Sequence, residues 1–355
     1  MSQIRLLIAD KDTMFLEKFS AYLHKNKNTQ FSLELFTVPE RFIDWVNKGE
    51  QADIMLVSSS FLSNLACEFE KDNLVILRDS PESFIPQGYR TINKYQPADN
   101  LMKELISLYA DKLPGERPKS EGSGTVHLVL YGDGSDVFNP MAQAMAVYKA
   151  STNKSVFYIN LDEFSNTDDF FQGTNTKDLS EMLYYIKAQK ENLSLKAEAC
   201  TSRDINWGVD FMKGHKNPED ISKLNASELK SLIGSIRGRN CYDDIVISRA
   251  FRQDELLNVL LDEASRIYIT FSDYYSSITR MVKVSQFIKQ KEHEKSGLTD
   301  KTIFCITVTG INQAPNTSID IPNFRKYMLP RPYDEEAVTT PRADYISALK
   351  TILEQ

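Results

Sequence analysis

Polar residues that could do chemistry follow short apolar runs in the first third of the chain. Asp10 and Asp12 come directly after the run 4–9, and Ser58 and Lys94 follow two later apolar runs. Apolar runs of this length predict buried strands. Carboxylate oxygens at the end of a strand suit a hard cation such as Mg²⁺. The alternative interpretation is a purely structural one, in which these acids cap turns and face solvent.

A second polar segment is the loop 131–140, which reads YGDGSDVFNP and separates a predicted strand from a predicted helix. A glycine-containing loop at such a junction can hold phosphate through backbone N–H groups, aided by the dipole of the following helix. Here Asp133 and Asp136 place two negative charges in the loop, and the loop contains no lysine or arginine. This charge pattern disfavours a polyphosphate.

Other catalytic and metal-binding patterns are absent from the sequence. The four histidines and four cysteines are isolated from one another: His24, His127, His215 and His293, and Cys67, Cys200, Cys241 and Cys305. They form no zinc spacing, no disulfide framework and no nucleophile–histidine arrangement. We expect His127, within an apolar run, to be a packed neutral side chain. The formal net charge of -7 argues against a nucleic-acid partner.

The elements that must position the first cluster alternate between strand and helix patterns. Strands are predicted at 4–9, 32–36, 53–57, 74–77 and 89–92, and helices near 15–23, 42–46 and 101–109. Such alternation predicts a parallel sheet with helices on both faces. We therefore assign residues 1–111 to a first domain. Residues 112–125 (KLPGERPKSEGSGT) are rich in Pro, Gly, Ser and charge, which predicts an interdomain linker.

The remainder, residues 126–355, repeats the same alternation. Strands are predicted at 126–131, 156–161, 244–248, 266–271 and 303–308, and helices at 140–150, 179–188, 224–236, 255–263 and 278–290. We expect Asp243 and Asp244 to cap or solvate the strand that they precede. The sequence as a whole predicts two doubly wound domains, each with three αβα layers.

The first domain resembles the receiver domains of response regulators, which have the flavodoxin/CheY-like fold. The segment LLIADKDTMFLEKF resembles their first strand and acidic cluster, with Lys11 in place of the second acid. Their phosphoacceptor aspartate ends the third strand, where ADIMLVS has Ser58. The late lysine of the family corresponds to Lys94 in INKYQP. The resemblance therefore implies a pseudo-receiver that takes no phosphoryl group, in which we expect Lys94 to pair with Asp10.

The second domain resembles the MinD/ParA ATPases, whose P-loop reads K-G-G-V-G-K-T. Aligned on this pattern, Asp133 replaces the signature lysine, and Phe138 replaces the P-loop lysine. Gly134 is kept, whereas Ser135 and Val137 replace glycines. Asp136 adds a negative charge, and Asn139 replaces the Mg²⁺-binding threonine. At the later switch and metal motifs, Asn160 and Asp162 lie near the family positions, and Ser248 replaces an aspartate. The resemblance thus implies a P-loop fold with degenerate motifs, and we expect no cofactor and no bound metal.

Receiver-like domain, linker and MinD/ParA-like domain together resemble the TadZ/CpaE proteins of the Flp (tight adherence) pilus machinery. The most specific stretches are YINLDEFSNTDDFFQG, DLSEMLYYIKAQKENLSLKAEAC and NCYDDIVISRAF. The resemblance implies a localisation protein whose partners are pilus or secretion assembly proteins. It also implies a homodimer in the cytoplasm that its partners recruit to a cell pole or to the inner membrane face.

Two other functions stay open at this point. A divergent ATPase would still bind ATP and Mg²⁺ through a rearranged loop and dimerise. A transcriptional or signalling regulator would use the receiver-like domain as its input, but the sequence has no helix-turn-helix signature. The sequence has no signal-peptide pattern and no apolar run long enough for a membrane span. We predict that the tail DYISALKTILEQ is a helix docked on the second domain.

Overall fold

The structure is a computed structural model of the 355-residue chain. It describes residues 4–25, 31–62, 73–80, 85, 88–110, 124–136, 139–239, 241–310, 321–333 and 341–354. The chain divides into two compact units, Met1–Lys112 and Leu113–Gln355, which are considered one at a time below. Most of the predicted linker at 112–125 lies outside the described residues, so its conformation stays a prediction.

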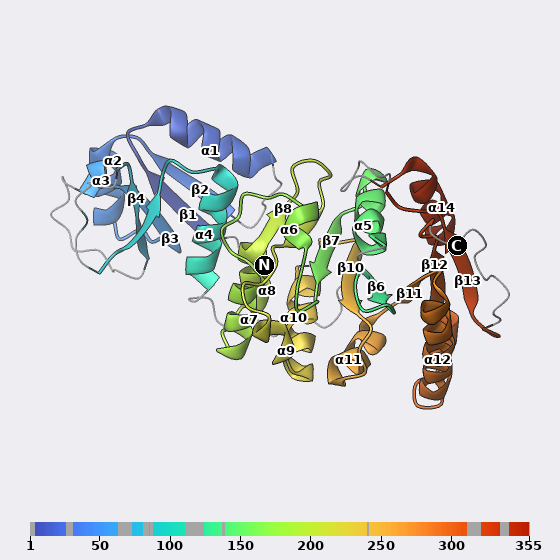
Figure 1. Ribbon diagram of the computed structural model, residues 1–355. Coiled ribbons are helices and arrows are strands. Elements are labelled where there is room, and N and C mark those ends of the chain that lie inside the picture. The colour runs from blue at the N-terminus through green and yellow to red at the C-terminus, as the bar shows by residue number, and fades with distance from the viewer. Residues whose placement is uncertain are drawn as a thin grey trace. The chain divides into compact units, whose positions relative to one another are not determined.

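The N-terminal unit is a five-stranded parallel sheet with helices on both faces (Figure 1). Its strands are β1 (Ile4–Ala9), β2 (Phe31–Phe36), β3 (Ile54–Ser58), β4 (Leu74–Arg78) and β5 (Arg90–Asn93), and its helices are α1 (Thr13–Lys25), α2 (Pro39–Asn47), α3 (Ser59–Leu62) and α4 (Ala98–Ala110). The strand order β2-β1-β3-β4-β5 is that of the flavodoxin-like doubly wound fold. All five predicted strands are present, and α3 was not predicted.

Burial explains why these residues form a two-faced sheet. The central strands β1 and β3 are apolar along most of their length, as strands covered on both faces must be. Phe42 of α2 and Phe61 of α3 pack against Leu7 and Val57 on one face. On α1, Leu16, Phe19 and Leu23 recur at helical spacing and are buried, consistent with a helix that covers the sheet.

The C-terminal unit contains an eight-stranded sheet within its described residues. Its strands are β6 (Thr125–Tyr131), β7 (Val156–Asn160), β8 (Thr201–Arg203), β9 (Asp210–Met212), β10 (Asp244–Ala250), β11 (Arg266–Ser272), β12 (Thr302–Thr307) and β13 (Arg325–Leu329). Its helices are α5 (Met141–Ser151), α6 (Thr167–Phe170), α7 (Leu179–Lys187), α8 (Leu193–Cys200), α9 (Glu219–Ser222), α10 (Ala226–Gly238), α11 (Glu255–Glu263), α12 (Tyr275–Glu292), α13 (Leu298–Lys301) and α14 (Ala343–Leu353).

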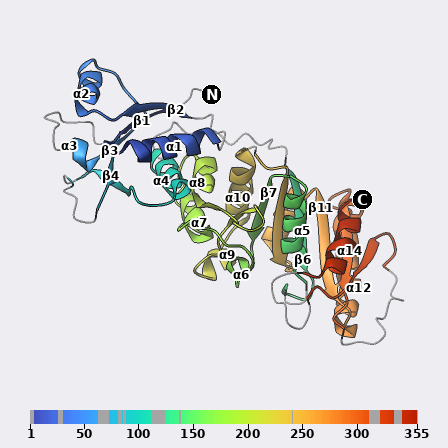
Figure 2. The same ribbon diagram turned by 90° about the horizontal axis from the view of Figure 1, so that it is seen from above.

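The order of this sheet is β13-β12-β11-β6-β10-β7-β9-β8, and all neighbours are parallel except β8 and β9. Alternate residues of β6 face two separate cores. Leu128 and Leu130 pack with α7, α10, α11 and α12, whereas Val129 and Tyr131 pack with α5 and α14. Figures 1 and 2 show these helix layers on the two faces of the sheet. The predicted fold class, two doubly wound αβα domains, is confirmed.

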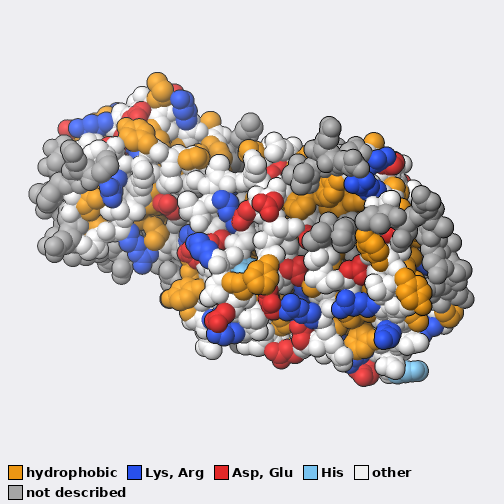
Figure 3. Space-filling model, viewed as in Figure 1, with side chains coloured by type: hydrophobic (Ala, Val, Ile, Leu, Met, Phe, Trp, Pro, Cys, Tyr) orange, Lys and Arg blue, Asp and Glu red, His pale blue; other side chains and the backbone are white. Residues whose placement is uncertain are grey.

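The C-terminal helix α14 is docked on the domain, as predicted. Tyr345 and Leu349 are fully buried against the core that also contains α5. Ile352 is also buried in this core, while Leu353 is only partly buried. Of the helices in the described part of the chain, none combines the length and apolarity needed to cross a bilayer. On the coloured part of the surface in Figure 3, basic and acidic side chains are interspersed.

A buried ion cluster joins α5 to the sheet, and here the prediction for Asp244 was wrong. Asp244 does not solvate the start of β10 but is buried, because three basic side chains surround its carboxylate. Its Oδ1 lies 2.6 Å from His127 Nε2 and 2.9 Å from Lys149 Nζ, and its Oδ2 lies 3.3 Å from Lys154 Nζ. Burial lowers the pKa of His127, with Lys149 adding to the effect, so the histidine is neutral as predicted. Asp243 remains at the surface, where it accepts a bond from the backbone of Ser155.

The Asp244→Asn variant is therefore expected to lose about 3 kcal/mol of stability, because it leaves the Lys149 ammonium buried without its counter-charge. The matched control is Asp243→Asn, which removes the same charge one residue earlier. It is expected to cost less than about 1 kcal/mol because an amide oxygen can still accept the Ser155 bond. Thermal unfolding followed by circular dichroism measures both variants. Equal losses in the two would contradict this role for Asp244.

Candidate functional site

The polar residues predicted for the N-terminal unit meet at one edge of its sheet. Asp10 follows β1, Ser58 ends β3 and Lys94 follows β5, and a residue that was not predicted, Asp79, follows β4. The strands are parallel, so their carboxyl ends share one edge. The fold itself therefore brings these side chains together from positions 84 residues apart in the sequence (94 minus 10).

Lys94 is the centre of this cluster. Its side chain is almost fully buried, and its Nζ lies 2.8 Å from Asp10, 3.2 Å from Asp12 and 3.5 Å from Asp79. The predicted pair of Lys94 with Asp10 is confirmed. Burial alone would lower the pKa of Lys94, but its bonds to Asp10 and Asp12 and the charge of Asp79 outweigh this and raise it. The site thus contains a permanent internal cation.

The acids are also held by backbone donors. Asp10 Oδ1 accepts a bond of 2.9 Å from the N–H of Asp12, and Asp12 Oδ1 accepts one of 3.0 Å from the N–H of Phe15 at the start of α1. The bond from Phe15, followed by that from Lys94, lowers the pKa of Asp12. Asp12 therefore both caps a helix and binds Lys94, whereas Lys11 between the acids is exposed.

Ser58 contributes a hydroxyl and no carboxylate to this edge. It is fully buried at the end of β3, and its Oγ lies 2.8 Å from the Oγ of Ser60. Asp79 is tied to the same segment, because Ser59 Oγ donates to its Oδ2 at 3.2 Å. The edge therefore holds three carboxylates around one ammonium, and the β3 position offers only a serine.

The second candidate site is the β6–α5 loop at the carboxyl edge of the larger sheet. Gly132 begins the loop where no side chain fits: a Cβ there would lie 2.2 Å from the ring of Phe271. Gly134 has φ of +94°, a conformation that favours glycine, and Gly134 and Ser135 are exposed. Val137 and Phe138 lie outside the described residues, so the prediction of a ring at the P-loop lysine position stays untested.

The Asp133 carboxylate is bound to the start of α12. Its Oδ2 accepts bonds from the N–H of Ser272 at 2.7 Å and from the Oγ of Ser272 at 2.8 Å. Its Oδ1 accepts a bond from Ser277 Oγ at 2.5 Å. Three donors from the β11–α12 junction therefore satisfy this carboxylate, and it locks the loop against that junction.

The Asp136 carboxylate is bound to two amides from other elements. Its Oδ2 accepts a bond of 2.8 Å from Gln143 Nε2 on α5 and another of 2.8 Å from Asn166 Nδ2 before α6. The loop residue Asp136 thereby joins the helix that follows it to the segment after β7. The donors that satisfy Asp136 come from the protein itself.

Asn139 is committed to internal bonds at both ends of its amide. The side chain is buried, and its Nδ2 donates to Thr307 Oγ1 at 2.6 Å. Its Oδ1 accepts a bond of 2.5 Å from the hydroxyl of Tyr345 on α14. The residue predicted at the metal-binding threonine position thus connects α5 to β12 and to the C-terminal helix.

The later predicted site residues lie at the end of β7 (Asn160), just after it (Asp162) and on the neighbouring strand β10 (Ser248). Asn160 Oδ1 accepts a bond of 2.8 Å from the N–H of Asp162, and Asp162 Oδ1 accepts one of 2.5 Å from the N–H of Ala250. Ser248 is fully buried with its Oγ 3.1 Å from the hydroxyl of Tyr158. These side chains stabilise the β7–β10 edge.

The β7–β10 edge carries negatively charged carboxylates that influence one another's environment. Burial raises the pKa of Asp162 to about 6, the Ala250 hydrogen bond acts against the rise, and the charge of Asp136 adds to it. Arg249 and Arg252 are near, but they form ion pairs with Asp254 and Glu163. Within the described part of the chain, no group of three or more His, Cys, Asp or Glu side chains could hold a metal ion.

Sequence reasoning did not find the partners of these residues. Ser272 is 139 positions from Asp133, and Tyr345 is 206 positions from Asn139. A local signal existed for one contact, because Gln143 on the predicted helix follows Asp136 by seven residues. The serines at the β11–α12 junction form no recognisable motif.

The raised pKa of Asp162 predicts a pH-dependent penalty. Because its pKa of about 6 in the folded protein exceeds the value near 4 of an unfolded chain, the ionised carboxylate opposes folding at neutral pH. This cost is present above pH 6 and is lost as the pH falls from 6 to 4. Asp162→Asn is expected to be more stable than the unaltered chain by about 1–2 kcal/mol at pH 7.5.

Urea unfolding of both proteins at pH 7.5 and at pH 5 checks this prediction. The advantage of Asp162→Asn should shrink at the lower pH. The control is Asp169→Asn, since Asp169 is exposed in the nearby α6. An advantage that is the same at the two pH values would rule out the titration of Asp162 as its cause.

Removal of the Lys94 ammonium should destabilise the N-terminal unit. Lys94→Met leaves three carboxylates facing one another and is expected to lose about 3 kcal/mol at pH 7. The loss should be smaller at pH 4, where part of the carboxyl groups bind protons. Thermal unfolding at both pH values measures it, with the exposed Lys48→Met as the control. A loss that does not depend on pH would show that only the lysine's packing matters.

Comparisons with known proteins find a matching family model for the first unit and solved structures of similar fold. A family model described as the TadZ-like receiver domain matches residues 2–110. No curated protein sequence matches the chain. A plasmid partition protein from Borrelia burgdorferi B31, solved with AMPPNP bound, is similar with a TM-score of 0.50 and 17% identity, covering 65% of this chain and 97% of that one. That similarity shows a shared fold.

Two other solved structures give similar alignments. The MinC:MinD cell division protein complex from Aquifex aeolicus has a TM-score of 0.49 and 13% identity, over 65% of this chain and 97% of that chain. A ParA family ATPase from Chlorobium tepidum TLS has a TM-score of 0.48 and 14% identity, over 66% and 92%. Residues 2–110 are thus similar to the TadZ-like receiver domain, and the chain also shares the fold of a plasmid partition protein.

Proposed function

We propose that this protein is a non-catalytic localisation and scaffold protein of a Flp/Tad pilus or related secretion assembly, and that it acts through protein–protein contacts. The TadZ-like receiver domain supports the pilus context. In this proposal the protein works as a homodimer in the cytoplasm and is recruited to a cell pole or the inner membrane face by its partners.

The observation that carries the proposal is the internal bonding of the β6–α5 loop. Asp133, Asp136 and Asn139 use their polar atoms on Ser272, Gln143 and Tyr345, among others. A bound triphosphate would have to approach two carboxylates without the lysines that neutralise it in P-loop proteins. Each pair of like charges at 4 Å costs about 4 kcal/mol at the effective dielectric constant of a protein surface. This cost supports a loop that does not bind nucleotide.

The carboxyl edge of the N-terminal sheet also supports a non-catalytic role, here for the receiver-like domain. A receiver forms an acyl phosphate on an aspartate at the end of its third strand, whereas Ser58 is a buried hydroxyl there. Lys94 already pairs with three carboxylates. We therefore propose that this domain presents a surface to partners and is not switched by phosphorylation.

The alternative is a divergent ATPase that binds MgATP and dimerises. It is favoured by the loop's remaining features: Gly134 keeps its φ of +94°, and Gly134 and Ser135 are exposed. The fold is also shared with a partition protein solved with AMPPNP. The two proposals differ in one measurable property, which is nucleotide affinity.

Titration of the full chain with a fluorescent ATP analogue, with and without Mg²⁺, tests the proposal. We expect no saturable binding at micromolar concentrations and no effect of Mg²⁺. Micromolar, Mg²⁺-dependent binding that is lost in Asn139→Ala would establish the ATPase alternative. The variant Ser151→Ala is the control, because Ser151 ends α5 at the opposite edge of the sheet from the loop.

A further inference from the structure

The helix α14 supplies one of the bonds that hold the β6–α5 loop. The hydroxyl of Tyr345 on α14 donates to Oδ1 of Asn139 at 2.5 Å, and both side chains are buried. At the other end of the same amide, Nδ2 of Asn139 donates to Thr307 at the end of β12 at 2.6 Å. Figures 1 and 2 show α14 beside α5, the helix that follows the loop. One buried amide therefore connects the loop to the sheet and to a helix that is distant in sequence.

The attachment of α14 to the domain is narrow. Of its eleven residues, Tyr345, Leu349 and Ile352 are buried, and they form one stripe at helical spacing. The other residues of the helix are exposed or partly buried. By contrast, all seven residues of β10 in the centre of the sheet are buried. A helix held by so few buried side chains can separate from the domain while the sheet stays folded.

A second bond between α5 and α14 lies at the surface. The hydroxyl of Tyr148 donates to Oε1 of Glu354 at 2.9 Å, and this bond is exposed. Water can replace a bond of this kind at little cost, whereas a buried polar group that loses its partner carries the full penalty of desolvation. The Tyr345 bond is therefore the polar contact through which α14 acts on the loop.

The segment before α14 contains a hydroxyl that opposes the docked state. Tyr333 has a buried hydroxyl oxygen without a hydrogen-bond partner in the described part of the chain. Burial raises the pKa of Tyr333, and the charge of the loop residue Asp136 adds to the rise. The neighbouring Pro332 accepts a backbone bond of 2.7 Å from Arg342 at the start of α14. The docked arrangement thus combines a satisfied hydroxyl at Tyr345 with an unsatisfied one at Tyr333, which is a cost.

We propose that α14 is a latch on the β6–α5 loop. While the helix is docked, Tyr345 holds Asn139 and the loop stays closed; when the helix leaves the domain, the loop opens with it. Coupling of this kind is reciprocal, so that opening of the loop also loosens α14. Binding of another molecule to the apolar stripe of α14 therefore changes the state of the loop. This goes beyond the proposed function, because it concerns how the loop is held and not what the loop binds.

Hydrogen exchange of the full chain, followed by mass spectrometry, tests the latch. Tyr345→Phe keeps the ring and removes the hydroxyl that bonds Asn139. We expect exchange to become faster by on the order of tenfold both in α14 and in the first turn of α5, with no change in β6 and β10. Faster exchange confined to α14 would overturn the proposal. A uniform rise over the whole domain would also overturn it, because that result indicates only lower global stability.

Two further variants test the reciprocal effect and the opposite effect. Asn139→Ala removes the same bond from the side of the loop, so exchange in α14 should become faster by on the order of tenfold. Tyr333→Phe removes the unsatisfied hydroxyl and should slow exchange both in α14 and in the first turn of α5. Unchanged exchange of α14 in Asn139→Ala would overturn the latch, and exchange that is not slowed in Tyr333→Phe would overturn the part assigned to Tyr333.

Tyr148→Phe is the matched control. It makes the same chemical change on α5 and removes the exposed bond to Glu354 on α14. Exchange in the first turn of α5 should stay as in the unaltered chain, because water replaces the lost partner. An effect there as large as that of Tyr345→Phe would overturn the proposal. None of these measurements uses nucleotide, so failure of the latch is distinguishable from failure of the proposed function.

Discussion

The constraint on which the C-terminal domain depends is that its loop carboxylates must find donors. Asp133 and Asp136 lie at the carboxyl edge of a parallel sheet, where backbone and helix dipoles would otherwise suit a phosphate. Buried or half-buried carboxylates without partners are costly. The structure meets this need with Ser272, Ser277, Gln143 and Asn166, so the loop is stabilised by contacts within the protein and no ligand is required to hold it.

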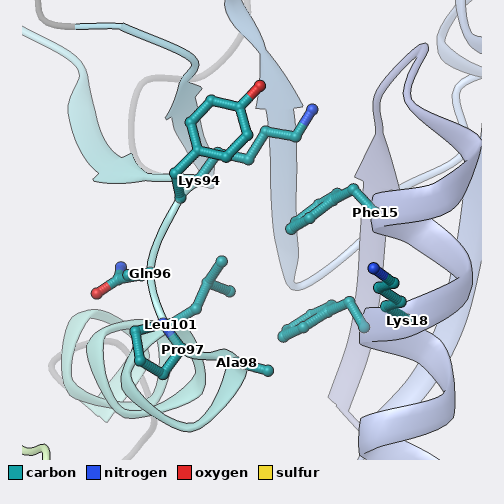
Figure 4. Close-up of a pocket in the computed structure, with 9 residues that line it drawn as sticks. Phe15, Lys18, Lys94, Gln96, Pro97, Ala98 and Leu101 are labelled. Atoms are coloured by element: carbon teal, nitrogen blue, oxygen red, sulfur yellow. The ribbon is translucent and has the colours of Figure 1, made fainter.

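The polar groups at the sheet edge of the N-terminal domain are also bonded within the protein, and there a cationic side chain holds the carboxylates. Three carboxylates gather where parallel strands end, and the ammonium of Lys94 takes the place that a bound cation would occupy among such ligands. Both edges are therefore satisfied by the protein's own side chains. Both edges also contact neighbouring elements: the Lys94 ammonium lies 5.0 Å from the centre of the Phe15 ring of α1 (Figure 4), and Asn139 accepts a bond from Tyr345 of α14.

The sequence predicted strongly periodic elements well and long-range polar contacts poorly. The pair of Lys94 with Asp10 was expected from the resemblance to receiver domains, and the parallel strands place the ends of β1 and β5 at one edge, where the pair forms. The strands β8 and β9 have three residues each, too few to show a period, and were missed. Asp244 was misjudged because its burial depends on His127 and Lys149, which are distant in sequence. The bonds of Asp133 and Asn139 involve ordinary serine, threonine and tyrosine side chains without a motif.

The most direct test of the account is a crystal structure of the full chain grown in the presence of MgATP. The account predicts that Asp133 remains bonded to Ser272 and Ser277, that Asp136 remains bonded to Gln143, and that no nucleotide is found at residues 132–139. Clear density for a nucleotide held by that loop, with a coordinated magnesium ion and with these internal bonds broken, would contradict it.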